Sequence, residues 1–195
     1  MTDPFAPKSH REEVDTFLMG GGGAPLLKFP TIGTKYTGIV IAKSVEQQRD
    51  YDDPDMLLWW SEGKRVKNAT QPTPETKPVL HAIVTLQTDA IGTFDKFGNF
   101  LEIDDDDSVR RWFVKGQAQK ALREAIQKSG GPTLELFSKV TVTYTGDGKQ
   151  DNPRYNPPKL VTAEYIRPEN VAKNDPLLLK VLSQGDNMDD DPFAS

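Results

Sequence analysis

Hydrophobic and polar residues alternate along several short stretches of this chain, with the two-residue period of β-strands. Leu80, Ala82, Val84 and Leu86 fall on one face of such a stretch, while His81 falls on the other. Other stretches are enriched in the β-branched and aromatic residues that strands favour. The pattern predicts five main strands, at residues 35–43, 79–88, 110–115, 139–145 and 159–167.

One stretch follows the helical period instead. Ala118, Leu122, Ala125 and Ile126 repeat on a single helical face, and the Ser-Gly-Gly-Pro sequence that follows is a helix stop. A helix is therefore predicted at residues 117–128, between the third and fourth strands. A shorter apolar turn is expected around residues 177–181.

Two connections between the predicted strands are long. Residues 44–78 are too many for a hairpin, so we expect this connection to serve a function. Residues 146–158 form a second long connection, rich in Gly, Asp and Pro. A small aromatic hairpin is predicted at residues 94–100. The Asp-rich stretch 104–107 is interpreted as a solvated turn, because it lacks the spacing of a calcium loop.

The order strand, strand, strand, helix, strand, strand is that of the OB-fold, a five-stranded Greek-key barrel. This fold binds oligonucleotides across its second and third strands and the loops that join strands one to two and four to five. Both long connections fall at those loops. A generic α+β sheet shares the element order, so this alternative stays open.

The amino-acid composition excludes several kinds of metal site and catalytic chemistry. The 195 residues include no Cys and only two His, which excludes disulfides, thiolate zinc sites, Cys nucleophiles and multi-histidine metal centres. The sequence contains neither a P-loop nor a serine nucleophile motif, so we expect a non-enzymatic protein without a metal or cofactor. No apolar run approaches the length of a membrane span and no signal peptide is evident, so a cytoplasmic location is expected.

The net charge of −5 at first argues against binding to nucleic acid, because phosphates attract basic surfaces. The acidic excess lies at the two ends, however, since residues 28–170 hold 20 Lys and Arg against 20 Asp and Glu. A neutral body of this kind can carry a basic groove on one face, and an acidic tail can compete for that groove.

The chain ends in an acidic run followed by Pro-Phe. Asp189, Asp190, Asp191, Pro192 and Phe193 follow a polar segment with little apolar surface to offset the cost of ordering, about 1–2 kcal/mol per residue. This ending resembles the C-terminal tip of bacterial and bacteriophage single-stranded DNA-binding proteins, which recruits replication and repair enzymes. With the element order, it gives a resemblance to a phage-type single-stranded DNA-binding protein over residues 26–167 and the tail.

The resemblance implies three parts: a flexible N-terminal segment at residues 1–25, an OB-fold single-stranded DNA-binding domain at residues 26–170, and a flexible acidic tail at residues 171–195. The tip departs from the family pattern, which commonly reads Asp-Asp-Ile-Pro-Phe with a terminal Phe. Here Asp191 precedes Pro192, and two residues follow Phe193. A partner that grips a terminal carboxylate would meet a displaced charge. The alternative interpretation is a solvating acidic tail.

Sequence-tolerant binding of single strands needs aromatic faces on which bases stack and cations that follow the phosphates. The first long connection supplies both, since two adjacent tryptophans precede a basic cluster. Their side chains point to opposite sides of an extended chain, so we expect one to pack on the barrel and the other to be free for stacking. The alternative is that both anchor the loop in the core.

Alternation in the third strand places Arg111, Phe113 and Lys115 outward and Trp112 with Val114 in the core. Arg110, at the strand edge, is expected to reach a phosphate. The predicted nucleic-acid-binding residues are Lys35, Lys43, Arg49, Tyr51, Trp59, Trp60, Lys64, Arg65, Lys67, Arg110, Arg111, Phe113, Lys115, Lys149, Arg154 and Tyr155.

We therefore expect a protein that coats and protects exposed single-stranded DNA during replication, recombination or repair, and whose tail contacts replication or recombination proteins. If the chain is of phage origin, its location is the cytoplasm of the bacterial host. The main alternative is an OB-like protein-interaction or virion accessory module without DNA binding. A nucleic-acid-processing enzyme is a second alternative, weakened by the scarcity of histidines and paired carboxylates.

Overall fold

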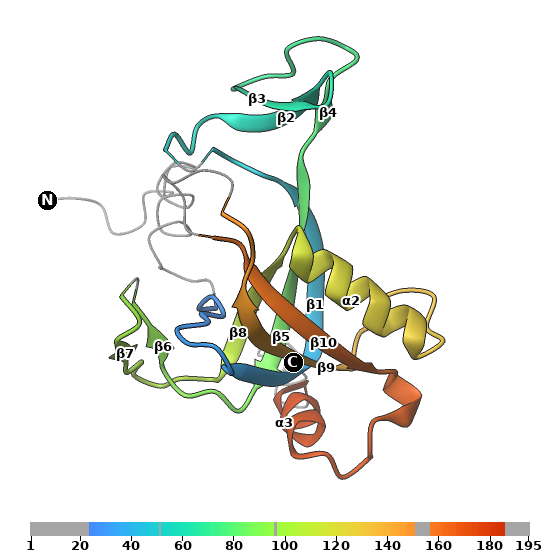
Figure 1. Cartoon of the computed structure of the whole chain (residues 1–195). Helices are drawn as coiled ribbons and strands as arrows, with labels where there is room; N and C mark the ends of the chain where they lie inside the picture. Colours follow the sequence, from blue (N-terminus) through green and yellow to red (C-terminus); the bar gives the residue numbers. More distant parts are fainter. Residues whose placement is uncertain (1–23, 51, 96, 151–156, 186–195) are drawn as a thin grey trace, which may run out of the picture.

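The structure is mainly β and its sheets are antiparallel, as the alternating pattern predicts. The computed structural model describes residues 24–50, 52–95, 97–150 and 157–185. Its main sheet contains five strands: β1 (Lys35–Gln47), β5 (Leu80–Thr88), β8 (Val109–Val114), β9 (Lys139–Asp147) and β10 (Lys159–Ile166). Helix α2 (Gln117–Lys128) lies between the third and fourth of them, so the predicted element order is confirmed (Figure 1).

The five strands are arranged in the order β10-β9-β1-β5-β8. The strands β9, β1, β5 and β8 have the spatial order of a Greek key, in which the fourth strand returns to lie beside the first. The expected barrel is not closed in the part of the chain that the structure describes, because no strand pairing joins β8 to β10.

The segment that precedes β1 occupies the gap between β8 and β10. Leu26 pairs in parallel with Arg111 of β8. On the other side, the ammonium of Lys159 in β10 donates a hydrogen bond to the carbonyl oxygen of Phe29 at 2.7 Å. A non-strand segment therefore joins the two edges that a closed barrel would pair directly.

The hydrophobic core lies between the main sheet and α2. Val40, Val84 and Leu86 are fully buried, and Leu122 of α2 packs against them. The remaining residues of the predicted helical face, including Ala118 and Ala125, border the same cluster. Burial of this apolar surface, at about 25 cal/mol per Å², is what holds α2 on the sheet.

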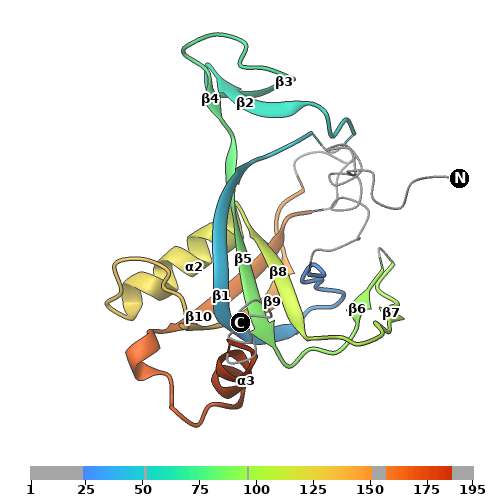
Figure 2. The ribbon, with the colours of Figure 1, turned by 180° about the vertical axis from the view of Figure 1, so that it is seen from behind.

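The first long connection folds into a three-stranded arm instead of an irregular loop. Its strands are β2 (Leu57–Ser61), β3 (Lys64–Asn68) and β4 (Lys77–Pro78). The β2–β3 turn consists of Glu62 and Gly63, both with positive φ, which matches a two-residue type I′ turn. Figures 1 and 2 show the arm projecting from one end of the body.

Hydrogen bonds connect the arm to the main sheet. The amide of Gln48 donates to the carbonyl oxygen of Val79 at 2.7 Å, and the amide of Leu58 donates to the carbonyl oxygen of Gln48 at 2.8 Å. The Gln48 side chain, which is buried, also donates to the carbonyl oxygen of Leu80. These contacts fix the arm relative to β1 and β5.

A second helix and a small hairpin lie at the other end of the body (Figure 1). The apolar turn expected around residues 177–181 is part of a longer helix, α3 (Pro176–Gly185), which packs against β1 and β5 after a short turn η1 (Pro168–Asn170). The predicted aromatic hairpin is present as β6 (Thr93–Phe94) and β7 (Phe100–Leu101). No helix in the described ranges is long and apolar enough to cross a membrane.

Candidate nucleic-acid interface

A groove of about 510 Å³ lies at the gap between β8 and β10. The segment before β1, the arm, β8 with the start of α2, and the start of β10 all contribute to its walls. Among the described residues that line it, five are cations and none is acidic. These cations are Lys28, Arg65, Arg111, Lys115 and Lys159. In a chain of net charge −5, the groove therefore concentrates positive charge.

Strand β8 forms the floor of the groove. Trp112 and Val114 are only 3% and 2% exposed, whereas Phe113 is 38% exposed, so the predicted orientation of this strand is confirmed. Arg111 is held in place by a hydrogen bond from its Nε to the carbonyl oxygen of Ala24 at 2.8 Å. The Phe113 and His81 rings form a T-shaped contact, with ring centroids 5.1 Å apart.

The arm supplies the upper wall. The guanidinium of Arg65 lies 5.2 Å from the centroid of the Trp60 ring, close enough for a cation–π contact. Arg65 and Lys77 are the cross-strand partners of Trp60, so aromatic and basic side chains share one face of the arm. Lys67 lies on that face too, but it forms an ion pair with Asp50 at 3.3 Å.

The two adjacent tryptophans lie in different surroundings, as alternation predicts. Trp60 is 40% exposed, whereas Trp59 is 8% exposed and donates its indole N–H to the carbonyl oxygen of Asn68 at 3.1 Å. Trp59 has Val66 and Pro78 as its cross-strand partners, so it is an anchor of the arm itself. It does not belong to the core cluster of the main sheet, where we had expected it to pack.

The start of α2 closes one end of the groove. Gly116, Gln117 and Ala118 all line it. No side chain caps the first turn of this helix, and that turn contains no acidic residue. Its backbone N–H groups and helix dipole therefore add to the positive potential of the groove.

Several predicted binding residues lie away from the groove. Lys43 donates to the carbonyl oxygen of Leu134 and Arg49 to that of Pro54. Lys64 is on the Trp59 face of the arm. Lys35 and Lys149 are exposed but do not line the groove. Tyr51, Arg154, Tyr155 and the tail residues Asp189, Asp190, Asp191, Pro192 and Phe193 lie outside the described residues.

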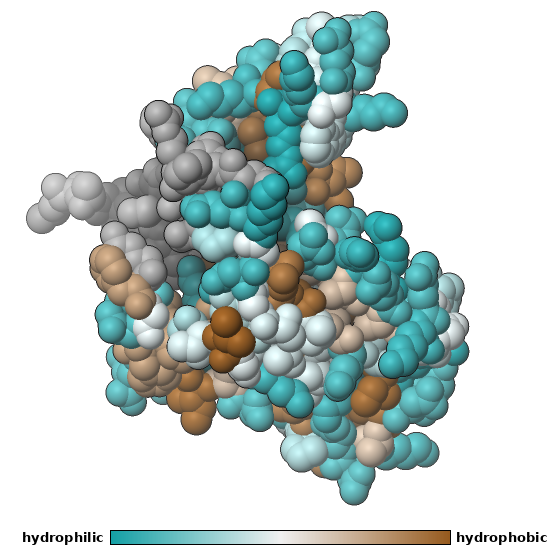
Figure 3. Space-filling view, in the orientation of Figure 1, coloured by the Kyte–Doolittle hydropathy of each residue, from teal (hydrophilic) through white to brown (hydrophobic). Residues whose placement is uncertain are grey.

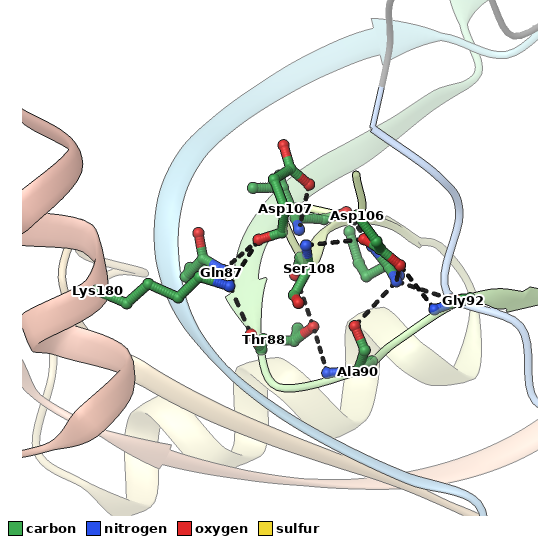
Figure 4. A network of polar contacts seen from close by, with 10 residues as sticks. Gln87, Thr88, Ala90, Gly92, Asp106, Asp107, Ser108 and Lys180 are labelled. Atoms are coloured by element: carbon green, nitrogen blue, oxygen red, sulfur yellow. Dashed lines mark hydrogen bonds and ion pairs between the residues drawn. The ribbon is translucent and has the colours of Figure 1, made fainter. Parts of the chain in front are cut away.

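Arg110 is not a surface residue, so its predicted phosphate contact is wrong. It is 1% exposed and shares the inner face of β8 with Trp112 and Val114. Its guanidinium pairs with the carboxylate of Asp106, with an Nη2 to Oδ2 distance of 2.5 Å, and donates to the carbonyl oxygens of Ala90 and Gly92. Figure 4 shows Asp106, Ala90 and Gly92 within one network of polar contacts. A buried charge requires such a partner, because desolvation is costly.

The interpretation of residues 104–107 as a solvated turn holds for Asp104, Asp105 and Asp107, which are exposed, but not for Asp106. Its side chain is 6% exposed and accepts hydrogen bonds from Arg110, from the amide of Ser108 at 2.8 Å and from the amide of Gly92 at 2.6 Å. The hydrogen bonds from Arg110 hold the pKa of the Asp106 carboxyl well below its usual range. Asp106 and Arg110 therefore form a structural pair.

Sequence analysis missed the groove cations Lys28 and Lys159 and the aromatic residue Phe29. Lys28 and Phe29 precede the first predicted strand, and Lys159 opens the last one. The structure brings them together only because the segment before β1 lies between β8 and β10. No local pattern in the sequence indicates a contact between residues so far apart in the chain.

Hydrophilic residues cover much of the arm and of the body, and hydrophobic residues form separate patches on this side (Figure 3). Within the described ranges, no three His, Asp or Glu side chains gather in the arrangement of a metal site. Comparison with protein-family models, curated proteins and solved structures gives no match to this chain.

Proposed function

We propose that the protein binds single-stranded DNA along the groove between β8 and β10. The observation that carries this proposal is the convergence of five cations, with no described carboxylate, beside the exposed rings of Trp60 and Phe113. Cations follow the phosphates of a single strand, and exposed rings stack on bases, at about 1–3 kcal/mol per base. Because every base has a π face, such binding tolerates many sequences.

The topology supports assignment to the OB-fold, which is a partly open Greek-key barrel. In that fold, nucleic acid crosses the second and third strands and contacts the loops between strands one and two and strands four and five. Here β8 is the third strand, the arm replaces the first of those loops, and Lys159 follows the second. The basic groove is bounded by these parts.

In this proposal the protein has no catalytic role. It coats exposed strands during replication, recombination or repair in the cytoplasm, and the acidic tail contacts the proteins that act on the coated DNA. A neutral body with a basic groove suits this role, because its attraction for phosphates is confined to one path.

Titration of a fluorescently labelled oligo-dT, followed by anisotropy, tests the proposal. If all five cations contact phosphates, a plot of log affinity against log salt has a slope of about −3.5, since each contact on single strands contributes about −0.7. Arg65→Ala and Lys115→Ala should each weaken binding and reduce that slope by about 0.7. Lys64→Ala, which removes an exposed cation from the other face of the arm, is the matched control and should leave the slope unchanged.

Two results would overturn the proposal: no binding at low salt, or equal affinity for duplex DNA. Tryptophan fluorescence provides an independent readout. Quenching on addition of oligo-dT, abolished by Trp60→Ala, supports stacking. Fluorescence that stays unchanged supports the alternative of a protein-interaction module.

A further inference from the structure

We infer that the DNA path continues beyond the groove to the β6–β7 hairpin, where Phe97 provides an additional base-stacking position. This inference rests on the proposed function and extends it. A second pocket, of about 270 Å³, lies against the hairpin and includes Phe94, Phe97 and Pro30 in its lining. Lys28, Phe29 and Lys159 line both this pocket and the basic groove, so the two are adjacent.

Phe97 has the ring best placed to meet a ligand there. It is 78% exposed, more than any other large hydrophobic residue in the part of the chain that the structure describes. Phe94, in the same lining, packs edge-to-face on Phe100 with centroids 5.9 Å apart, which gives the hairpin a small aromatic base. A flat apolar face beside cations matches a nucleotide, which joins a base to a phosphate.

The turn that carries Phe97 is held by one carboxylate. Asp95 accepts hydrogen bonds from the amide of Phe97 at 2.7 Å, from the amide of Asn99 at 2.9 Å and from the Asn99 side chain at 2.9 Å. These hydrogen bonds, led by that of the Asn99 side chain, lower the pKa of Asp95. Phe97 and Asn99 are thus held in place before a ligand arrives, and pre-organisation reduces the entropy lost on binding.

The base of the hairpin is tied to β8. The amide of Gly92 donates to Asp106 (Figure 4), and the guanidinium of Arg110 donates to the carbonyl oxygen of Gly92 at 2.7 Å. Arg110 lies next to Arg111 in the strand that forms the groove floor. One buried ion pair therefore positions the hairpin relative to the residues proposed to bind DNA.

Positive charge where the basic groove meets the second pocket favours a nucleic acid strand over an apolar partner. Lys159 is held there by the carbonyl oxygen of Phe29, and its ammonium lies 4.2 Å from the centroid of the Tyr144 ring. Lys28 is exposed beside it. Asp95 is the one carboxylate in the described lining of the second pocket, and its oxygens are occupied by the hairpin turn.

The length dependence of binding tests this inference. Oligo-dT of about 5 nucleotides should fill the groove alone, and oligo-dT of about 15 nucleotides should reach the hairpin, within the range of about 4–16 nucleotides bound by one such domain. Phe97→Ala is expected to leave the affinity for the short strand unchanged and to weaken the affinity for the long strand by about 5- to 150-fold. Phe97→Leu should show the same loss, because leucine keeps an apolar side chain but has no ring to stack.

Phe137→Ala is the matched control, since Phe137 is 45% exposed and lines neither pocket. It should bind both strands as the wild type does. Unchanged affinity of Phe97→Ala for the long strand overturns the hairpin position and leaves the proposed function intact. Equal losses for both strands overturn the extended path, because Phe97 would then belong to the primary site. If the wild type binds neither strand, both proposals fail.

Discussion

Replacing Asp106 with Asn should destabilise the protein strongly, although the two side chains have the same shape. The wild-type carboxylate accepts hydrogen bonds from Nη1 and Nη2 of Arg110 and from the amides of Ser108 and Gly92. Asparagine has a single acceptor oxygen, brings an NH₂ group toward these donors and leaves the Arg110 charge unpaired. The Asp106 and Arg110 side chains are only 6% and 2% exposed, so water cannot replace the lost hydrogen bonds.

Breaking a buried ion pair in this way costs about 3–5 kcal/mol, a large part of the roughly 5–15 kcal/mol that stabilises a typical protein. Urea denaturation followed by circular dichroism measures the loss as a lower midpoint at an unchanged slope. Asp104→Asn, an exposed neighbour in the same turn, is the control and should change the free energy of unfolding by no more than about 0.5 kcal/mol. A loss below about 1 kcal/mol for Asp106→Asn would refute the view that this pair anchors the hairpin.

Further substitutions test the structural and binding roles of single residues. Trp59→Ala should lower the free energy of unfolding by about 3 kcal/mol or more in urea denaturation, because it removes the buried ring that anchors the arm. Trp60→Ala should leave stability near the wild-type value and weaken oligo-dT binding about 5- to 150-fold. Burial lowers the pKa of His81 in the folded protein, so the unfolded chain binds more protons just below pH 6.5. The free energy of unfolding therefore decreases as the pH falls from there toward the folded-state pKa. His81→Asn should flatten this part of a curve of stability against pH. Gly92→Ala should reduce the stability by more than about 1 kcal/mol, measured as a lower melting temperature, because φ is +67° and an added Cβ would lie 2.4 Å from the Phe100 ring. Gly63→Ala is the control and should reduce the stability less, because Gly63 also has positive φ but has open space around it.

The strands and α2 could be predicted because their signals are local. Side-chain alternation and helical periodicity are properties of consecutive residues, and the core that forms between the sheet and α2 uses the faces they define. The arm was missed because its strands are short and its turn, Glu62-Gly63, lacks the common Asn-Gly sequence. Its pairing with residues near Lys77 depends on contacts that no local pattern reveals.

Arg110 could have been assigned correctly from the sequence. It shares its strand face with Trp112 and Val114, which were placed in the core, so the same alternation puts its charge inside. A buried guanidinium needs a carboxylate, and the acidic stretch four residues earlier supplies one. The position of Lys159 beside Phe29, by contrast, depends on how distant parts of the chain meet.

The basic groove and the open sheet have a common origin in the segment before β1. Leu27 is 9% exposed and belongs to the core cluster, with Phe29 packed against that cluster, while Lys28 between them remains exposed. The segment thus fills the gap between β8 and β10 with apolar side chains and places a cation at the surface. Alternation has the same result in β8, where Trp112 and Val114 point inward and Arg111 and Lys115 line the groove. Both segments bury apolar residues and place Lys28, Arg111 and Lys115 along the same groove, so residues far apart in the sequence contribute to one positive path on a body with no net charge.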